Sequence, residues 1–247
     1  MPEEQTLNRY RELAARSAQS GIYVYTDFHS PAGASLAYRI TDERNVKMWG
    51  GAETCERVIV RFGDPEDIGY EEGFPISVIR IFPKQAKYAD ALTHRDFLGA
   101  LMNLGLERDV IGDIYVCDNE AYVFVCERIA GYITDELTQV KHTPVRCEIT
   151  DAVPEEARPK LKEESVTVSS PRLDGIIARA YHMSRSEAKS LFNSEEVFIN
   201  GRLCANPFHE PAEGDVISVR GHGKMIYDGV ARRTSKDRFA VIIRKYT

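Results

Sequence analysis

Basic side chains and a helix-capping pattern lie close together between residues 172 and 202. Arg185 and Lys189 are four residues apart, so on a helix they project from one side. They follow Ser184, which forms a Ser-x-x-Glu capping box with Glu187 and predicts that a helix begins here. The free N–H groups and the positive dipole end of a helix N-terminus favour phosphate. This spacing therefore indicates a site for an anionic ligand.

A second basic segment lies nearer the end of the chain. Arg220, His222 and Lys224 occupy the end of a predicted strand and the glycine-rich turn after it. Together with the helices they predict a basic rim, which suits the phosphates of structured RNA. Basic residues on a helix are also common on surfaces that contact only water, and His222 by itself is typical of a surface position. RNA binding requires these basic side chains to lie close together in the fold, whereas residues that contact only water can point in different directions.

Two short helices and a small sheet are predicted to position these residues. Apolar residues at helical spacing predict one helix over residues 173–180 and a second over residues 184–192. Asn200-Gly201 is the dipeptide of a type I′ hairpin turn, a structural role by default. A strand is predicted from the turn at residues 214–215 to Arg220.

The charge of the chain is distributed unevenly. The 247 residues carry 32 Lys+Arg and 38 Asp+Glu, a net charge of −6. From residue 172 onward there are 13 Lys+Arg and 9 Asp+Glu, a balance of +4. That leaves 19 against 29 for residues 1–171, a balance of −10. An acidic front and a basic end indicate an anionic partner for the C-terminal part.

The cysteines and the N-terminal residues indicate the compartment. Five cysteines without a Cys-x-x-Cys pair argue against a disulfide framework or a zinc site, and fit a reducing cytoplasm. The N-terminus lacks the basic stub and apolar stretch of a signal peptide. The longest apolar-rich run, FLGALMNLGL, is far shorter than the roughly 20 residues of a membrane span. We therefore expect a cytoplasmic protein with no membrane partner.

The order of the elements predicts an α+β protein with three small domains. Residues 1–73 predict a small N-terminal α/β domain that ends in the acidic, turn-rich segment DPEDIGYEEGF. Residues 74–153 have the order β-α-β-β-α-β, the ferredoxin-like arrangement that the RRM shares. Prolines and charged residues predict a polar linker at residues 154–170, and the basic domain occupies residues 171–247.

Motifs in the basic domain resemble those of the S-four RNA-binding domain, which is named after the fourth small-subunit ribosomal protein. In order, they are Arg172-Leu173-Asp174, Ser184-Arg185-Ser186-x-Ala188, Val197-x-Ile199-Asn200-Gly201 and Gly214-Asp215-x-Ile217-x-Val219. The segment THRDFLGALMNLGLERDVIGDIYV and the junction VTVSSPRLD look like those of YlmH-type proteins. In that family an RRM-like domain precedes the S-four domain.

This resemblance implies a C-terminal S-four domain of the αL type. It also implies a set of RNA-binding residues: Arg172, Ser184, Arg185, Lys189, Asn200, Arg220 and Lys224. Gly201 of the hairpin turn and His222 of the basic rim complete the candidate RNA-binding residues. The implied protein is bacterial, acts at the ribosome on large-subunit rRNA or tRNA, and serves the rescue or quality control of stalled ribosomes. A cell-division role is also associated with the family. Glu195 and Glu196 depart from the family pattern and would weaken phosphate contact beside the hairpin.

An RNA-modifying enzyme that uses the S-four module for delivery is the main alternative. Arg172-Leu173-Asp174 is similar to the catalytic triplet of pseudouridine synthases. Here Gly-Ile-Ile-Ala follows it, so Asp174 is expected to cap or orient the first helix. The sequence has no GxGxxG, phosphate loop or His-Glu-x-x-His pattern, and we expect neither catalysis nor a cofactor or metal. A division scaffold that binds RNA incidentally is a third hypothesis.

Overall fold

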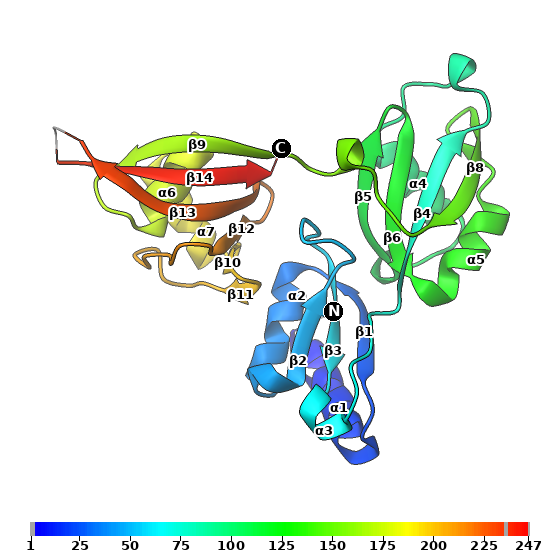
Figure 1. Ribbon diagram of the computed structural model, residues 1–247, viewed down its shortest axis with the longest axis horizontal. Coiled ribbons are helices and arrows are strands. Elements are labelled where there is room, and N and C mark those ends of the chain that lie inside the picture. Colours follow the sequence, from blue (N-terminus) through cyan, green and yellow to red (C-terminus); the bar gives the residue numbers. More distant parts are fainter. Residues whose placement is uncertain (1–2, 235–236, 247) are drawn as a thin grey trace. The chain divides into compact units, whose positions relative to one another are not determined.

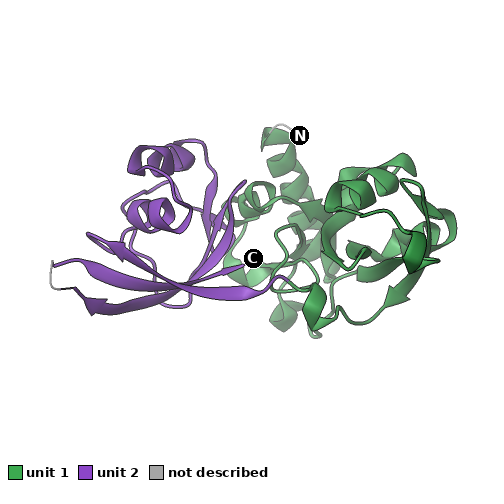
Figure 2. Ribbon diagram, turned by 90° about the horizontal axis from the view of Figure 1, so that it is seen from above, with its two compact units in different colours: residues 1–158 green, residues 159–247 purple. Residues whose placement is uncertain are grey.

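The computed structural model describes residues 3–234 and 237–246. The chain forms two compact units, residues 1–158 and 159–247 (Figure 2). In the described ranges the strands form three antiparallel sheets, and helices pack against them (Figure 1). This is the α+β class that the sequence predicted. None of the helices in these ranges has both the length and the apolar character needed to cross a membrane.

The first part of the chain is a three-stranded sheet with helices against it. Its elements are α1 (Glu3–Ser20), β1 (Val24–His29), α2 (Pro31–Ser35), η1 (Leu36–Arg39), η2 (Glu43–Asn45), β2 (Val46–Trp49), β3 (Val58–Phe62) and α3 (Pro65–Ile68). The strand order is β1-β3-β2. Helix α1 buries Leu7, Tyr10 and Leu13, because these residues recur at helical spacing. The hydroxyl of Ser30 accepts a hydrogen bond from the N–H of Gly33 at the start of α2.

The middle part has the predicted order β-α-β-β-α-β, with one additional two-residue strand, β7, before the last strand. Its elements are β4 (Ile76–Pro83), η3 (Ala86–Tyr88), α4 (His94–Asn103), η4 (Arg108–Val110), β5 (Ile111–Cys117), β6 (Glu120–Cys126), α5 (Glu127–Glu136), β7 (Gln139–Val140), β8 (Thr143–Thr150) and η5 (Glu155–Ala157). The strand order is β5-β6-β4-β8-β7, so β4 lies between β6 and β8. Thr93 and Asp96 form a capping box at the start of α4. Gly105 follows the end of α4 with a φ of +80°, which glycine adopts without strain.

The first and middle parts share one hydrophobic core. Phe28 of β1 and Ile59 of β3 belong to the same buried cluster as Phe97 of α4. Arg57 joins the two parts further, because its guanidinium donates to the carbonyl oxygens of Ile111 (3.0 Å) and Phe28 (2.9 Å). The two domains predicted at residues 1–73 and 74–153 therefore form a single compact unit.

The C-terminal unit has a six-stranded sheet with two helices on one of its faces (Figure 2). Its elements are β9 (Leu161–Val168), α6 (Leu173–Ala180), α7 (Arg185–Asn193), β10 (Val197–Ile199), β11 (Arg202–Leu203), β12 (Val216–Val219), β13 (Gly223–Arg233) and β14 (Phe239–Tyr246). The strand order is β11-β10-β12-β13-β14-β9. Apolar residues of the sheet, such as Met225 and Val241, pack with Ile176 of α6 and Phe192 of α7.

The sequence placed a linker at residues 154–170, and the structure differs there. Residues 161–168 form β9, which pairs with β14 along its whole length. Val166 and Val168 of β9 are buried in the core of the C-terminal unit. That unit therefore begins at Pro159 and not at residue 171. The strand β9 was not predicted because it contains many charged residues. Such residues occur there because β9 is an edge strand with much of its surface in water.

Candidate functional site

The helices of the C-terminal unit form where the sequence predicted them. Helix α6 buries its apolar stripe, including Leu173, Ile176 and Ile177, against the sheet. Helix α7 buries Ala188 and Phe192 in the same core. Because these faces are fixed, Arg172, Arg185 and Lys189 keep part of their side chains at the surface of the unit.

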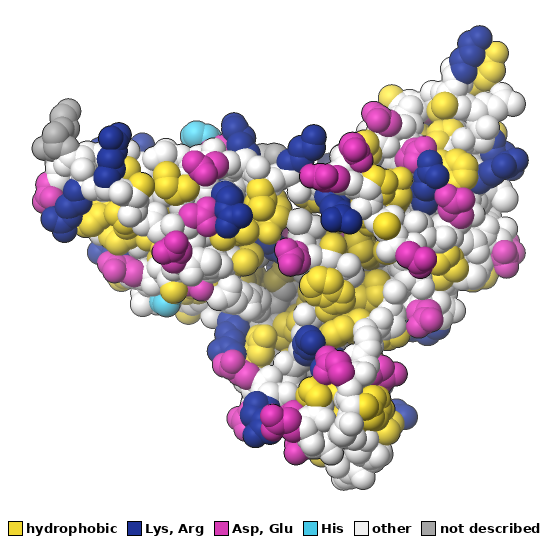
Figure 3. Space-filling view, in the orientation of Figure 1, with side chains coloured by type: hydrophobic (Ala, Val, Ile, Leu, Met, Phe, Trp, Pro, Cys, Tyr) yellow, Lys and Arg dark blue, Asp and Glu magenta, His cyan; other side chains and the backbone are white. Residues whose placement is uncertain are grey.

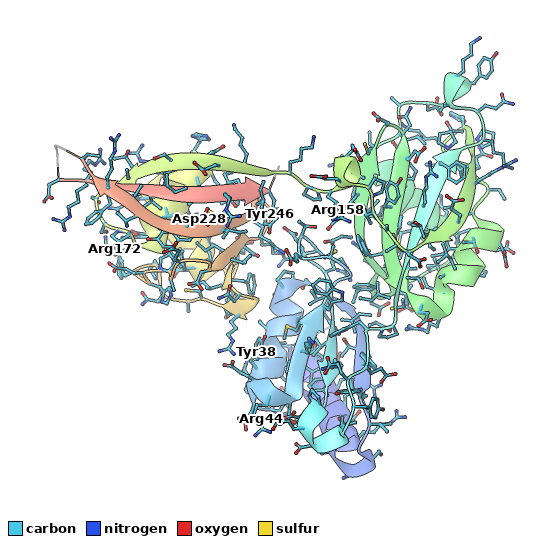
Figure 4. The ribbon with its side chains drawn as sticks, viewed as in Figure 1. Tyr38, Arg44, Arg158, Arg172, Asp228 and Tyr246 are labelled. Carbon is cyan, nitrogen blue, oxygen red and sulfur yellow. The ribbon has the colours of Figure 1, made fainter. Side chains whose placement is uncertain are left out.

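Three basic side chains meet near the N-terminal end of α6. Nε of Arg172 and Nη2 of Arg185 each lie 3.6 Å from Oδ1 of Asp174, which is fully buried. The ring of Phe208 lies 4.8 Å from the guanidinium carbon of Arg172 and 5.0 Å from Nζ of Lys189. We call Arg172, Arg185 and Lys189 the basic cluster. Figure 4 labels Arg172 at its place in the unit.

Asp174 positions the basic cluster without neutralising it. Its Oδ1 accepts a hydrogen bond from the N–H of Gly175 and is shared by the two guanidinium groups. A guanidinium has five N–H donors, so one carboxylate oxygen at 3.6 Å leaves most of them for another anion. The Arg172 and Arg185 side chains are 34% and 46% exposed. With Lys189 included, the group has two more positive charges than negative ones.

Phe208 is the residue of this site that the sequence did not single out. It lies in the loop before β12, and its ring is 50% exposed. The loop is fixed to the start of α6, because Pro207 and His209 accept the N–H groups of Asp174 and Leu173 through their carbonyl oxygens. An exposed aromatic ring beside two cations can stack on a nucleobase while the cations bind phosphates. The only sequence signal was an aromatic residue in an Asn-Pro-containing turn.

The N-terminus of α7 has the predicted capping box, and this box occupies the place where a phosphate was also expected. Oγ of Ser184 accepts the N–H of Glu187 (3.1 Å), and the Glu187 carboxylate accepts the N–H of Ser184 (2.7 Å). A carboxylate therefore already occupies the positive end of this helix, where a phosphate was expected. These bonds from Ser184 lower the pKa of Glu187. Above the ordinary glutamate pKa of about 4.3, Glu187 is ionised and its capping interaction contributes fully to stability. As the pH falls through the lowered pKa of Glu187, the carboxylate is protonated and this contribution is lost.

Replacing Ser184 by alanine is expected to lower the free energy of unfolding of the C-terminal unit by about 1 kcal/mol, because one helix cap is lost. Chemical denaturation of the full chain measures this change. Ser190→Ala is the matched control, since Ser190 is exposed and its hydroxyl donates within the helix, to the carbonyl of Glu187. Its stability is expected to change by under about 0.5 kcal/mol. Equal losses in both variants would contradict the capping role.

Lys224 does not join the basic cluster. Residue 225 in the same strand is Met225, which is fully buried under the helices, and neighbouring side chains of a strand point to opposite faces. Lys224 therefore points away from the helices, and its Nζ lies 6.0 Å from the ring of Tyr246. Arg172 and Tyr246 lie toward different ends of the unit (Figure 4). The expectation that Lys224 shares one surface with Arg172 is wrong.

Arg220 and His222 lie at the other end of α6 from the basic cluster. Both belong to the turn between β12 and β13 and are exposed. The His222 ring is 5.6 Å from the ring of Tyr181, which follows the C-terminal end of α6. The eight residues of α6 span about 12 Å, so this turn and Arg172 are separated by the length of the helix.

Asn200 and Gly201 form the predicted hairpin turn. Their φ angles are +50° and +78°, the left-handed values that a type I′ turn requires. The Asn200 side chain donates to Asp215 (2.8 Å) and accepts the N–H of Val216 (2.9 Å). The side-chain amide of Asn200 therefore links the hairpin to the start of β12. Both the nitrogen and the oxygen of this amide already have protein partners.

The aromatic rings of β5 and β6 in the middle part are closed to bases. Tyr115, Tyr122 and Phe124 on these strands are all buried, whereas Phe82 of β4 is half-buried, with the guanidinium carbon of Arg80 4.6 Å from its ring. The segment that contains Gly51 and Thr54 packs over them: the Thr54 hydroxyl bonds to that of Tyr115, and Gly51 lies against Phe124. Burial raises the pKa of the Tyr115 hydroxyl. An RRM that stacks bases needs such aromatic rings exposed on the sheet.

Comparison with known proteins assigns the chain to a family. The family model described as "Putative RNA-binding domain in YlmH" matches residues 70–153. The Bacillus subtilis (strain 168) protein named ribosome-associated protein quality control protein P2 is 31% identical over 230 residues, which are 87% of this chain and 84% of the relative. The chain belongs to the YlmH family. A solved structure, cell division protein ylmH from Streptococcus pneumoniae, is 24% identical with a TM-score of 0.49, over 61% of this chain and 92% of that one.

The YlmH family match and the basic cluster lie in different parts of the chain. Residues 70–153 contain β4 to β8, the sheet of the middle part. Arg172, Arg185 and Lys189 lie outside that range, in the C-terminal unit. Two parts of the chain are therefore candidates for ligand binding. One is residues 70–153, which match the family model, and the other is the C-terminal unit, which contains the basic cluster.

Proposed function

We propose that this protein binds structured RNA of the large ribosomal subunit, either rRNA or a tRNA held there, and that it catalyses no reaction. The observation that carries the proposal is the convergence of three cations: Arg172 and Arg185 meet at Asp174, and Arg172 and Lys189 lie beside the exposed ring of Phe208. Guanidinium and ammonium groups around an aromatic ring match a phosphate backbone with an accessible base. Binding to ribosomes would place the protein in the cytoplasm.

The two parts of the chain have different proposed relationships to RNA. We propose that the C-terminal unit is an S-four RNA-binding domain and that the middle part is RRM-like in fold but not in its mode of binding. The buried sheet aromatics support that distinction. The Bacillus subtilis relative is named for ribosome-associated protein quality control, and we propose that role at stalled ribosomes for this chain as well.

The position of Asp174 supports a non-catalytic role. A pseudouridine synthase would need this carboxylate to reach a substrate, but Asp174 is fully buried and lies against two guanidinium groups. Its environment suits a residue that holds Arg172 and Arg185 in place. Among the residues that the structure describes, no group of three or more His, Cys, Asp and Glu residues could hold a metal ion.

Co-sedimentation with purified large ribosomal subunits over a salt series tests this function. If the three cations of the basic cluster each contact a phosphate, the logarithm of the binding constant should fall against the logarithm of salt concentration with a slope of about −3. A slope near zero would contradict phosphate binding. Binding only to the small subunit would contradict the proposed location.

A further inference from the structure

The segment between β4 and α4 stands out from the middle part (Figure 1). Its tip is the short helix η3, which holds Tyr88 with 75% of its surface exposed. This is a large apolar ring in water, and Tyr is a residue enriched at binding hot spots. Because Tyr115, Tyr122 and Phe124 of the sheet are buried, the Tyr88 ring is an exposed aromatic residue of the middle part that can stack on a base.

Hydrogen bonds hold this segment in a defined position. The N–H of Tyr88 donates to the carbonyl of Gln85 (3.2 Å) within η3. The N–H of Asp90 donates to the Thr143 hydroxyl (2.9 Å), and the N–H of Leu92 donates to the Asn119 side chain (3.0 Å). A ring on an anchored segment loses little conformational entropy when it binds a partner.

The charges around Tyr88 favour an anionic partner. Lys87 Nζ lies 5.4 Å from the Tyr88 ring, and Lys84 is exposed in the same segment. The carboxylate of Asp90, the acidic residue of this segment, already accepts hydrogen bonds from His142 N–H and the Thr143 hydroxyl (both 3.3 Å). Figure 3 shows basic and hydrophobic side chains together at the tip of the segment.

We infer that residues 84–92 are a second RNA contact, in which Tyr88 stacks on an unpaired base while Lys84 and Lys87 bind the adjacent phosphates. The inference rests on the proposed function, since it takes RNA as the ligand of the whole protein. It differs from the basic cluster in its place in the chain, since residues 84–92 belong to the unit of residues 1–158 and the basic cluster to that of residues 159–247. A stacking ring requires a base free of its own neighbours. The middle part therefore selects a single-stranded segment beside the structured RNA.

Binding of the full chain to a labelled 20-nucleotide oligouridylate tests the contact. Tyr88→Ala is expected to weaken this binding about tenfold, because base stacking on an aromatic ring is lost. Tyr88→Phe, which keeps the ring, is expected to stay within about twofold of the parent protein. Lys84→Gln with Lys87→Gln should flatten the salt slope by about 1.4, the value for two phosphate contacts on a single strand.

Matched variants test whether the loss of binding is specific to residues 84–92, or follows from the loss of any exposed tyrosine or positive charge. Tyr132→Ala removes another exposed tyrosine of the same unit, and Arg9→Gln with Arg11→Gln removes two exposed charges from α1. These controls are expected to bind the oligonucleotide as the parent protein does. Equal losses in the controls and in the Tyr88→Ala variant would overturn the inference, because the effect would then be unspecific.

The outcomes also distinguish this inference from the proposed function. If Tyr88→Ala binds the oligonucleotide normally while changes in the basic cluster weaken subunit binding, residues 84–92 are not an RNA contact and the proposed function stands. If Tyr88→Ala weakens binding to large subunits but not to the oligonucleotide, the ring docks on a protein and the inference fails. If cluster changes leave subunit binding intact, the proposed site fails instead.

Discussion

Replacing both Arg185 and Lys189 by alanine is expected to weaken binding to large ribosomal subunits by roughly 30- to 150-fold. Each lost contact between a cation and a phosphate is taken as about 1 to 1.5 kcal/mol, and about 1.4 kcal/mol is a factor of ten. The salt slope should fall by about two, because two phosphates lose their partners. Co-sedimentation over a salt series measures both quantities.

Arg179→Ala with Lys162→Ala is the matched control for this double change. Both residues are exposed in the C-terminal unit and lie outside the basic cluster, so the net charge changes equally. The control is expected to lose under about threefold in affinity, since only the long-range field changes. Asp174 keeps Arg172 beside it in the cluster variant, so the fold is expected to persist. Similar losses in both double variants would show that net charge, not the cluster, governs binding.

Replacing Gly51 by alanine is expected to lower the free energy of unfolding of the first unit by about 3 kcal/mol. Gly51 has a φ of +101°, and a Cβ there would lie 2.3 Å from Cδ1 of the buried Phe124 ring. Overpacking costs about 1 to 3 kcal/mol, and an unfavourable backbone conformation adds a comparable amount. Chemical denaturation followed by fluorescence of Trp49, the single tryptophan, reports on this unit.

Gly73→Ala provides the control for the Gly51 substitution. A Cβ at Gly73 would meet nothing within 4 Å, so its stability is expected to stay within about 0.5 kcal/mol of the parent protein. RNA binding by the basic cluster is expected to survive Gly51→Ala at temperatures below the transition, because the cluster belongs to the other unit. Unchanged stability of the Gly51→Ala variant would mean that this segment does not pack on the sheet.

The sequence by itself determined the local elements of this protein. The apolar stripe of α6, the capping box at Ser184 and the Asn200-Gly201 turn each appear where they were predicted. The β-α-β-β-α-β order of the middle part was also predicted correctly. These features depend on residues within a few positions of each other, so their causes can be seen in the order of amino acids.

Only the tertiary structure decided which residues gather at the candidate site. Arg185 meets Asp174 across two helices, and Phe208 reaches Lys189 from a loop that is anchored to α6. Lys224 lies on the face of the sheet away from the helices, because side chains alternate along a strand and the helices cover the face that holds Met225. Such contacts depend on how distant segments pack, and no local pattern in the sequence encodes them.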